Sequence, residues 1–128
     1  MGRGMKDGPK ANRGMFMELT IKIRSNPEKR QELYQALQEL LPTIRNERGC
    51  LDCRIFSDVE EGQIFFLSVH WEARANLENY LRACSGIALL GAIELLGESA
   101  AFRTGHDAPW EGIDALKMVR KKRNSMPG

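Results

Sequence analysis

The sequence is poor in the residues that most enzyme chemistry uses. It has two histidines and three cysteines in 128 residues, and aromatic side chains make up 7% of it. A small, odd number of cysteines argues against a disulfide-bonded secreted scaffold. The chain also lacks a run of the roughly 20 apolar residues that a membrane helix needs, and no apolar segment follows its basic N-terminus as in a signal peptide. We therefore expect a cytoplasmic protein that is neither secreted nor embedded in a membrane.

A surplus of charge of one sign is missing as well, because the net charge is only +2. Residues 1–14 carry four basic and one acidic side chain, and residues 107–128 carry five and three. The middle of the chain is therefore mildly acidic. Nucleic-acid binders usually carry a basic face on the folded domain itself, because contacts to phosphates supply much of their affinity. We expect no nucleic-acid partner.

The length leaves room for one domain with its own core. Residues 1–14 contain four glycines and Pro9 without a periodic apolar pattern, which predicts a disordered N-terminal tail. Residues 15–106 are expected to form the domain. Residues 107–128 are expected to form a basic tail, either solvated or containing a short helix that docks on the domain or on its partner.

The first half of the domain predicts a strand followed by a long helix. Apolar and polar residues alternate over 16–24, which indicates a half-buried strand. Residues 25–28 read Ser-Asn-Pro-Glu, a helix-start signal with proline in the first turn. Apolar residues then recur at helical spacing until the chain reaches Gly49. Pro42 predicts a kink or a break near the end of this helix.

The second half predicts a hairpin, a helix and a last strand. Apolar and polar residues alternate over 51–56, which predicts a second strand, and a polar turn at 58–62 leads to a third strand at 63–71. A second helix carries Leu77, Tyr80, Leu81 and Cys84, followed by a shorter apolar segment at 87–96 and a strand at 100–104.

The order β-α-β-β-α-β is that of an α+β, ferredoxin-like antiparallel sheet. The strand over 63–71 is apolar on both faces, which is typical of a strand covered on both sides. Helices would cover one face. The other face, which includes Ile64 and Phe66, would be covered by a second subunit in a homodimer that pairs as a dimeric α/β barrel.

Three features together resemble the antibiotic biosynthesis monooxygenase (ABM) family. They are Glu47-Arg48-Gly49-Cys50 after the first helix, the aromatic strand that ends in Trp71-Glu72, and the apolar helical segment from Leu77 to Leu90. The resemblance spans about residues 16–104. It implies homodimers with apposed sheets and, for some members, oxidation of quinols or polyketide aromatics by molecular oxygen without metal or flavin. We therefore expect no cofactor and no metal.

The chain departs from the family pattern at several positions. Active monooxygenases carry an asparagine four residues before the tryptophan, where this chain has Leu67, and a glutamate just ahead of it, where this chain has Val69-His70. Relatives often show histidines where this chain has Tyr80 and Ser85. Haem-degrading members bind iron through a histidine of that second helix, so the resemblance implies no haem here.

The residues expected to line a ligand pocket are Trp71, Tyr80, Leu67 and Phe65. Trp71 shares a strand face with Leu67 and Phe65 and offers a broad apolar surface with one N–H donor, which suits a flat aromatic ligand. It could equally be a core anchor. Tyr80 could point its phenol into the same space, or be a packed tyrosine with a satisfied hydroxyl. No catalytic residue can be named from the sequence.

The histidines and cysteines are weaker candidates. Strand alternation puts His70 on the face opposite Trp71, where a structural or interface role is favoured, and His106 is expected in a solvated loop. Cys50 and Cys53 have redox spacing, but residues three apart on a regular strand point to opposite faces. A second pair that could complete a zinc site is missing from the sequence.

Two functions follow from these observations. The first is a cofactor-independent monooxygenase that oxidises a small aromatic or quinol with molecular oxygen. The second is a non-catalytic dimeric module that binds a small apolar ligand or a protein partner.

Overall fold

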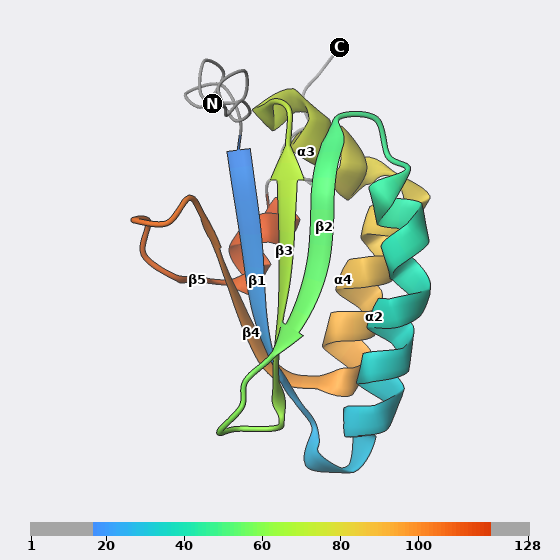
Figure 1. The fold of residues 1–128 in the computed structure, drawn as a ribbon, viewed down its shortest axis with the longest axis vertical. Helices are drawn as coiled ribbons and strands as arrows, with labels where there is room; N and C mark the ends of the chain where they lie inside the picture. Colours follow the sequence, from blue (N-terminus) through green and yellow to red (C-terminus); the bar gives the residue numbers. More distant parts are fainter. Residues whose placement is uncertain (1–16, 119–128) are drawn as a thin grey trace, which may run out of the picture.

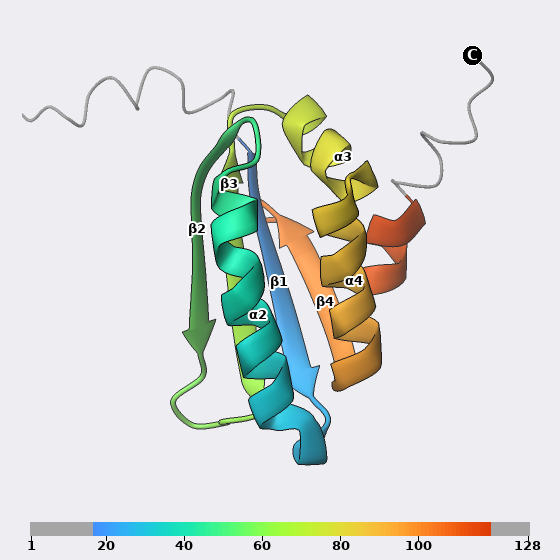
Figure 2. The same cartoon turned by 90° about the vertical axis from the view of Figure 1, so that its right-hand side faces the viewer.

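The fold is a five-stranded antiparallel sheet with helices packed on one face (Figures 1 and 2). The computed structural model describes residues 17–118, so the predicted tail at 1–14 lies outside the described residues. The elements follow the chain as β1 (Met17–Ser25), the 3-10 helix η1 (Pro27–Lys29), α2 (Arg30–Arg45), β2 (Cys50–Ser57), β3 (Ile64–Trp71), α3 (Arg74–Arg82), α4 (Cys84–Leu96), β4 (Gly97–Thr104) and β5 (Glu111–Gly112). The strand order is β2-β3-β1-β4-β5. The predicted ferredoxin-like α+β class is confirmed, with β5 as an additional edge strand.

The central strand β1 decides which face of the sheet is the core. Its buried residues are Leu19, Ile21 and Ile23, which alternate with partly exposed polar side chains. β1 pairs antiparallel with both β3 and β4. Because side chains alternate across a strand, the register places Leu67 and Phe102 on the same buried face as Ile21.

Helix α2 follows the predicted start signal, but it ends at Arg45, short of the predicted end near Gly49. The Asn26 side chain accepts a hydrogen bond from the Glu28 backbone N–H at 3.1 Å and caps η1, which leads into α2. The helix runs through Pro42 to Arg45, so the expectation of a break there is wrong. Pro42 removes only the one bond that its N–H would make to the preceding turn, and its own carbonyl still accepts from the Asn46 N–H at 3.1 Å.

A tight junction separates α3 from α4. The second helix was expected to carry Cys84, but α3 ends at Arg82, Ala83 is extended, and Cys84 opens α4 as an exposed residue. A Cβ added at Gly86 would lie 2.9 Å from the Leu81 Cα and would clash with the carbonyl oxygen of Tyr80. The absence of a side chain at Gly86 therefore allows the first turn of α4 to pack on the end of α3. Helix α4 continues through Gly91.

The chain after β4 wraps around the edge of the sheet. The Trp110 ring lies over the face away from the helices, 4.6 Å from the Arg103 guanidinium carbon. Residues 113–118 then form a helix beside α4 (Figure 2), and the Leu116 side chain is 1% exposed within the core. The Lys117 ammonium fixes this helix to α4 through the Glu94 carboxylate at 2.6 Å.

The sheet face away from the helices, here called the outer face, is partly apolar. Phe56 and Phe66 are partners in the β2–β3 register, and Phe56 is 51% exposed. Ile64, which was expected to need a partner subunit for cover, is only 5% exposed. Its backbone bonds the β2–β3 turn on both sides, with Asp58 N–H and Glu61 C=O. The exposed apolar part of this face therefore centres on Phe56 and Phe66.

Candidate functional site

Two of the predicted pocket residues meet between the sheet and the helices. Trp71 ends β3 on the helix-facing side and is 0% exposed, and Tyr80 lies on the buried side of α3. Their ring centroids are 5.3 Å apart at an interplanar angle of 34°. This tilted contact is within the range of favourable aromatic pairs. The pair joins the end of the central hairpin to α3.

The other two predicted pocket residues lie farther along the same strand. Phe65 stacks on Tyr34 of α2 with ring centroids 6.0 Å apart, and the Arg30 guanidinium carbon lies 5.0 Å from its ring. At about 3.3 Å per strand residue, Phe65 is roughly 20 Å from Trp71 and Leu67 roughly 13 Å. Phe65, Leu67 and Trp71 share the helix-facing side of β3, but only Trp71 pairs with Tyr80 of α3.

The indole N–H of Trp71 is a buried donor that the described residues leave without an acceptor. Most buried polar groups in native proteins are paired, and an unpaired one costs about 1–3 kcal/mol. An acceptor atom placed beside this ring would recover that cost. The unpaired donor is the feature of the core that points most directly to a ligand.

A short polar chain leads from Tyr80 toward the surface. The Tyr80 hydroxyl donates to the backbone carbonyl of Ser85 at 3.3 Å, and the Ser85 hydroxyl donates to the Glu47 carboxylate at 2.8 Å. Burial is the main cause that raises the pKa of Tyr80, so the phenol keeps its proton and stays a donor. These two hydrogen bonds connect α3, the first turn of α4 and the turn between α2 and β2.

Cys50 and Cys53 lie on the same side of the sheet, so the expectation that they face opposite sides is wrong. They are opposite Trp71 and Val69, which are both buried on the helix-facing side. The register shifts between Cys50 and Asp52, and this bulge inserts one residue that reverses the alternation. Leu51 is turned outward as a result. Burial raises the pKa of Cys50 and raises that of Cys53 to about 12, so both thiols are poor nucleophiles.

The two histidines lie away from the aromatic pair. His70 alternates with Trp71 and lies on the outer face, as expected, with its Nε2 atom 3.6 Å from the Glu18 carboxylate. His106 is exposed, and its Nε2 atom lies 3.0 Å from the same carboxylate. Both imidazoles therefore interact with Glu18 on the side of the sheet opposite Tyr80.

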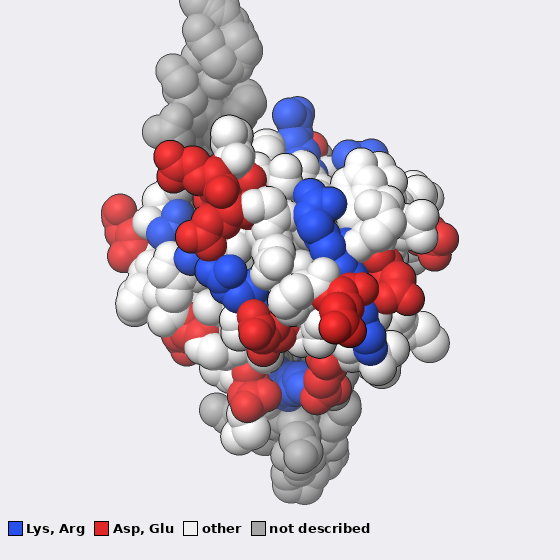
Figure 3. Space-filling model, turned by 90° about the horizontal axis from the view of Figure 1, so that it is seen from below, with Lys and Arg blue, Asp and Glu red and all other residues white. Residues whose placement is uncertain are grey.

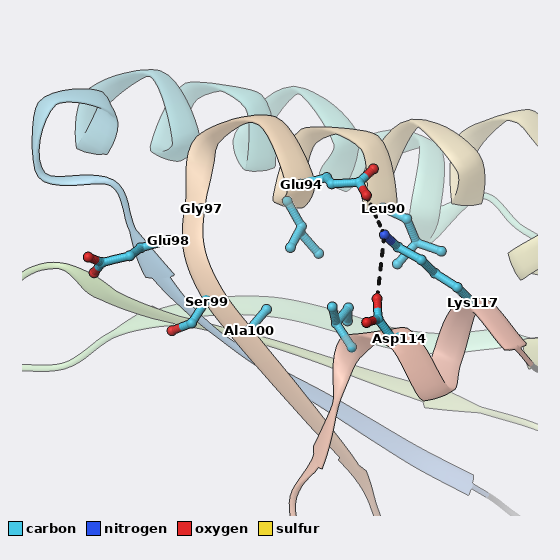
Figure 4. A pocket seen from close by; sticks show the side chains of 10 residues that line it. Leu90, Glu94, Gly97, Glu98, Ser99, Ala100, Asp114 and Lys117 are labelled. Carbon is cyan, nitrogen blue, oxygen red and sulfur yellow. Dashed lines mark hydrogen bonds and ion pairs between the residues drawn. The ribbon is translucent and has the colours of Figure 1, made fainter.

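Two hollows at the surface of the described residues are lined by other residues. One of about 190 Å3 lies between α4, the start of β4 and the helix at 113–118, and Figure 4 shows Lys117 reaching across it to Glu94 and Asp114. Another of about 460 Å3 lies along α2 and β2, next to Tyr34 and Ile55. Trp71 and Tyr80 line neither of them. The aromatic pair is closed from solvent, and its role in ligand binding stays a prediction.

The described residues give little support for other kinds of site. Between residues 17 and 118, no group of three or more His, Cys, Asp and Glu side chains is arranged to hold a metal ion. No helix in that stretch is long and apolar enough to cross a membrane. On the face shown in Figure 3, Lys and Arg lie among Asp and Glu instead of forming a patch of one sign.

Sequence reasoning did not connect Glu47 with Ser85. Glu47 was part of the motif that ends the first helix, but it had no assigned role, and Ser85 entered only as a departure from a family position. The two residues are 38 positions apart, and only the fold brings their side chains together.

A family model described as antibiotic biosynthesis monooxygenase matches residues 16–85, which include Glu47, Trp71, Tyr80 and Ser85. The chain belongs to this family. The match covers more than half of the sequence and ends at the first turn of α4. The resemblance noted in the sequence is thereby confirmed.

Solved structures agree on the fold. A protein from Shewanella oneidensis is 19% identical, with a TM-score of 0.68 over 73% of this chain and 91% of its own. One from Pseudomonas aeruginosa is 20% identical, with a TM-score of 0.67 over 74% and 96%. A structure named antibiotic biosynthesis monooxygenase is 19% identical, with a TM-score of 0.65 over 73% and 99%. None of the curated proteins matches the chain. At these identities the structural matches establish the architecture alone.

Proposed function

We propose that this ABM-family protein is a cofactor-independent monooxygenase that oxidises a small aromatic or quinol with molecular oxygen. The observation that carries the proposal is the buried Trp71 indole N–H, which has no acceptor among the described residues and lies beside the Tyr80 ring. Family membership supports the reaction class. The cytoplasm is the proposed location.

The chemistry needs little from the protein. An electron-rich quinol that loses a proton can pass an electron directly to oxygen, and the two radicals then combine at a ring carbon. Loss of water leaves a hydroxylated quinone, so one quinol and one O2 give one hydroxyquinone and one water. The protein contributes by excluding water, orienting the ring and stabilising the developing anion. In this proposal the ligand ring packs beside the Trp71 indole, and one of its oxygens accepts from the Trp71 N–H and from the neutral Tyr80 hydroxyl, which gives up its bond to the Ser85 carbonyl.

The closed position of the aromatic pair sets a condition on binding. Trp71 and Tyr80 are at most 2% exposed, so a ligand enters only if the helices above β3 move apart. The α3–α4 junction is the proposed point of opening, because Ser85 holds it to the α2–β2 turn by one side-chain hydrogen bond.

Oxygen uptake with a panel of quinols and hydroxyquinones tests this function. We expect turnover by the wild-type protein and a loss of about 10-fold or more in Trp71→Ala and Tyr80→Phe, each of which removes a ring or a donor from the site. Tyr34→Phe is the matched control, because Tyr34 stacks on Phe65 at the other end of β3. Equal oxygen uptake by wild type, Trp71→Ala and Tyr80→Phe would refute the proposal.

A second candidate is a non-catalytic module that binds a small apolar ligand. The complete burial of Trp71 favours it, because a closed aromatic core needs no reaction to explain it. Native mass spectrometry of protein isolated from its source distinguishes the two. An aromatic molecule that is retained and stays unchanged in air supports the module, whereas its conversion in air supports the oxygenase.

We also propose that the protein is a homodimer through the outer face of its sheet. The half-exposed Phe56 beside Phe66 supports this, because a contiguous exposed apolar patch often marks an interface. Light scattering at micromolar concentration should give twice the chain mass for the wild type and one chain mass for Phe56→Asp. Leu95→Asp, on the helix side of the molecule and 69% exposed, should leave the mass unchanged. A wild-type monomer would refute this proposal.

A further inference from the structure

Among the described residues, Glu47 is the carboxylate whose charge acts on Tyr80. Its half-buried carboxylate accepts the Ser85 hydroxyl at 2.8 Å, and among the described residues it forms no ion pair. It lies at the end of α2, where the chain turns into β2. The proposed oxidation requires a proton acceptor. The Trp71 indole N–H can only donate, and the Tyr80 phenol keeps its proton because burial raises its pKa.

The other titratable groups facing this position cannot serve as bases near neutral pH. The phenol of Tyr80 on α3 and the thiols of Cys50 and Cys53 on β2 all keep their protons, because burial raises their pKa values. Arg45 of α2, whose charge acts on the same thiols, is a permanent cation. His70 lies on the opposite face of the sheet. Asp52, whose charge also acts on both thiols, pairs with Arg54 at 3.0 Å and lies opposite His70 on the outer face. Elimination within the described cluster leaves the carboxylate of Glu47.

We propose that Glu47 is the acid–base residue of this site and takes the hydroxyl proton of a phenolic ligand after Ser85 releases its carboxylate. The inference rests on the proposed function and narrows its substrate class. Trp71 supplies one donor, Tyr80 supplies a second when its hydroxyl leaves the Ser85 carbonyl, and Glu47 supplies one acceptor. The matching ligand is an aromatic ring with one hydroxyl that donates to Glu47 and a second oxygen that accepts from the other two.

The step balances as a proton transfer alone. The O–H bond of the ligand breaks, an O–H bond forms on a Glu47 carboxylate oxygen, and the electron pair stays on the ligand oxygen as its anion. No electron leaves the ligand until molecular oxygen reacts in the following step. The neutral Glu47 then no longer repels the ligand anion beside it.

A binding experiment tests this without relying on turnover. The ligands are 1-naphthol and 1-methoxynaphthalene, which differ by the hydroxyl proton that Glu47 would accept. Binding is followed under argon by Trp71 fluorescence in a Trp110→Phe background, because the chain contains two tryptophans. Glu47→Ala should weaken the affinity for 1-naphthol at least 10-fold, as expected for losing a hydrogen bond to a charged group. The affinity for 1-methoxynaphthalene should stay within about twofold of the wild type.

Ser85→Ala should change the affinity for 1-naphthol in the opposite direction. The ligand then competes with no hydroxyl for the carboxylate, so 1-naphthol should bind about threefold to tenfold more tightly. Glu39→Ala, which removes an exposed carboxylate from the preceding helix α2, is the matched control and should change the affinity for neither ligand.

Glu47→Gln tests the proton transfer itself and keeps the side-chain shape. With 1,4-naphthohydroquinone and oxygen, kcat should fall about 100-fold or more, KM should change only a few-fold, and the acid limb of the pH profile should disappear. A purely structural role would instead leave the pH profile in place.

The outcomes separate this inference from the function on which it rests. If both naphthalenes bind and Glu47→Ala affects them equally, or kcat survives in Glu47→Gln, the role of Glu47 is wrong while the ligand pocket stands. If the wild type binds neither compound up to its solubility limit, the pocket fails and the role of Glu47 fails with it.

Discussion

The packing of α4 on α3 can be tested with two glycines of the same helix. Gly86 and Gly91 are both helical, and alanine has a higher helix propensity than glycine by about 0.5–1 kcal/mol. A Cβ at Gly91 would meet nothing within 4 Å, whereas one at Gly86 would clash with the backbone of Tyr80 and Leu81. The same substitution should therefore have opposite effects at the two positions.

The magnitudes follow from those surroundings. Gly91→Ala should raise the free energy of unfolding by about 0.5–1 kcal/mol, because its Cβ adds no contact and the full gain in propensity remains. At Gly86 the clash is with main-chain atoms of Tyr80 and Leu81 that no rotamer change can move. Overpacking of this kind costs about 1–3 kcal/mol or more. We expect Gly86→Ala to lose about 2 kcal/mol net.

Urea denaturation followed by circular dichroism gives the free energy of unfolding of both variants, and thermal denaturation gives their Tm. For a domain of about 100 residues, 1 kcal/mol moves Tm by about 5 °C, so the two variants should differ by more than 10 °C. Displacement of the first turn of α4 should also lengthen the Ser85–Glu47 hydrogen bond and so loosen the cover of Trp71. If Gly86→Ala is as stable as Gly91→Ala, the close helix contact described here is wrong.

The remaining predictions concern β2. Arg45 donates from Nε and one terminal nitrogen to the Cys53 carbonyl at 3.0 and 2.9 Å. Arg45→Leu should therefore lower the free energy of unfolding, measured in urea, by about 1 kcal/mol, whereas Arg54→Leu, from an exposed ion pair, should lower it by less than about 0.5 kcal/mol. Equal losses would contradict this role of Arg45. Burial raises the pKa of Cys53 from 9.0 to about 12, so above pH 9 the unfolded chain releases a proton that the folded chain keeps. The contribution of this thiol to the free energy of unfolding is fully present below pH 9 and should fall by up to about 1.4 kcal/mol per pH unit above it. The free energy of unfolding should therefore fall more steeply with pH in the wild type than in Cys53→Ala, and identical slopes would refute the prediction. A maleimide should label the exposed Cys84 first, the partly buried Cys50 slowly and Cys53 only on unfolding, as read by peptide mass spectrometry; early labelling of Cys53 would contradict its burial.

The residues of β3 show which side-chain positions the sequence pattern could predict and which it could not. Alternation along 63–71 was enough to place Trp71 on the helix-facing side and His70 on the other, because successive strand residues point to opposite faces. It could not show that Phe65 packs on Tyr34, far from Trp71, because distance along a strand says nothing about which helix residue lies above each position.

The sequence by itself determined the order of strands and helices, the buried face of β1 and the family of the chain, since hydrophobic periodicity and helix-start signals are local. Only the tertiary structure decided three further features: the bulge that turns Cys50 and Cys53 to one side, the passage of α2 through Pro42, and the contact between Glu47 and Ser85. The physical reason is the same in each case. A bulge depends on the partner strand, a helix end depends on what satisfies its last carbonyls, and a side-chain contact across 38 residues depends on how the layers pack.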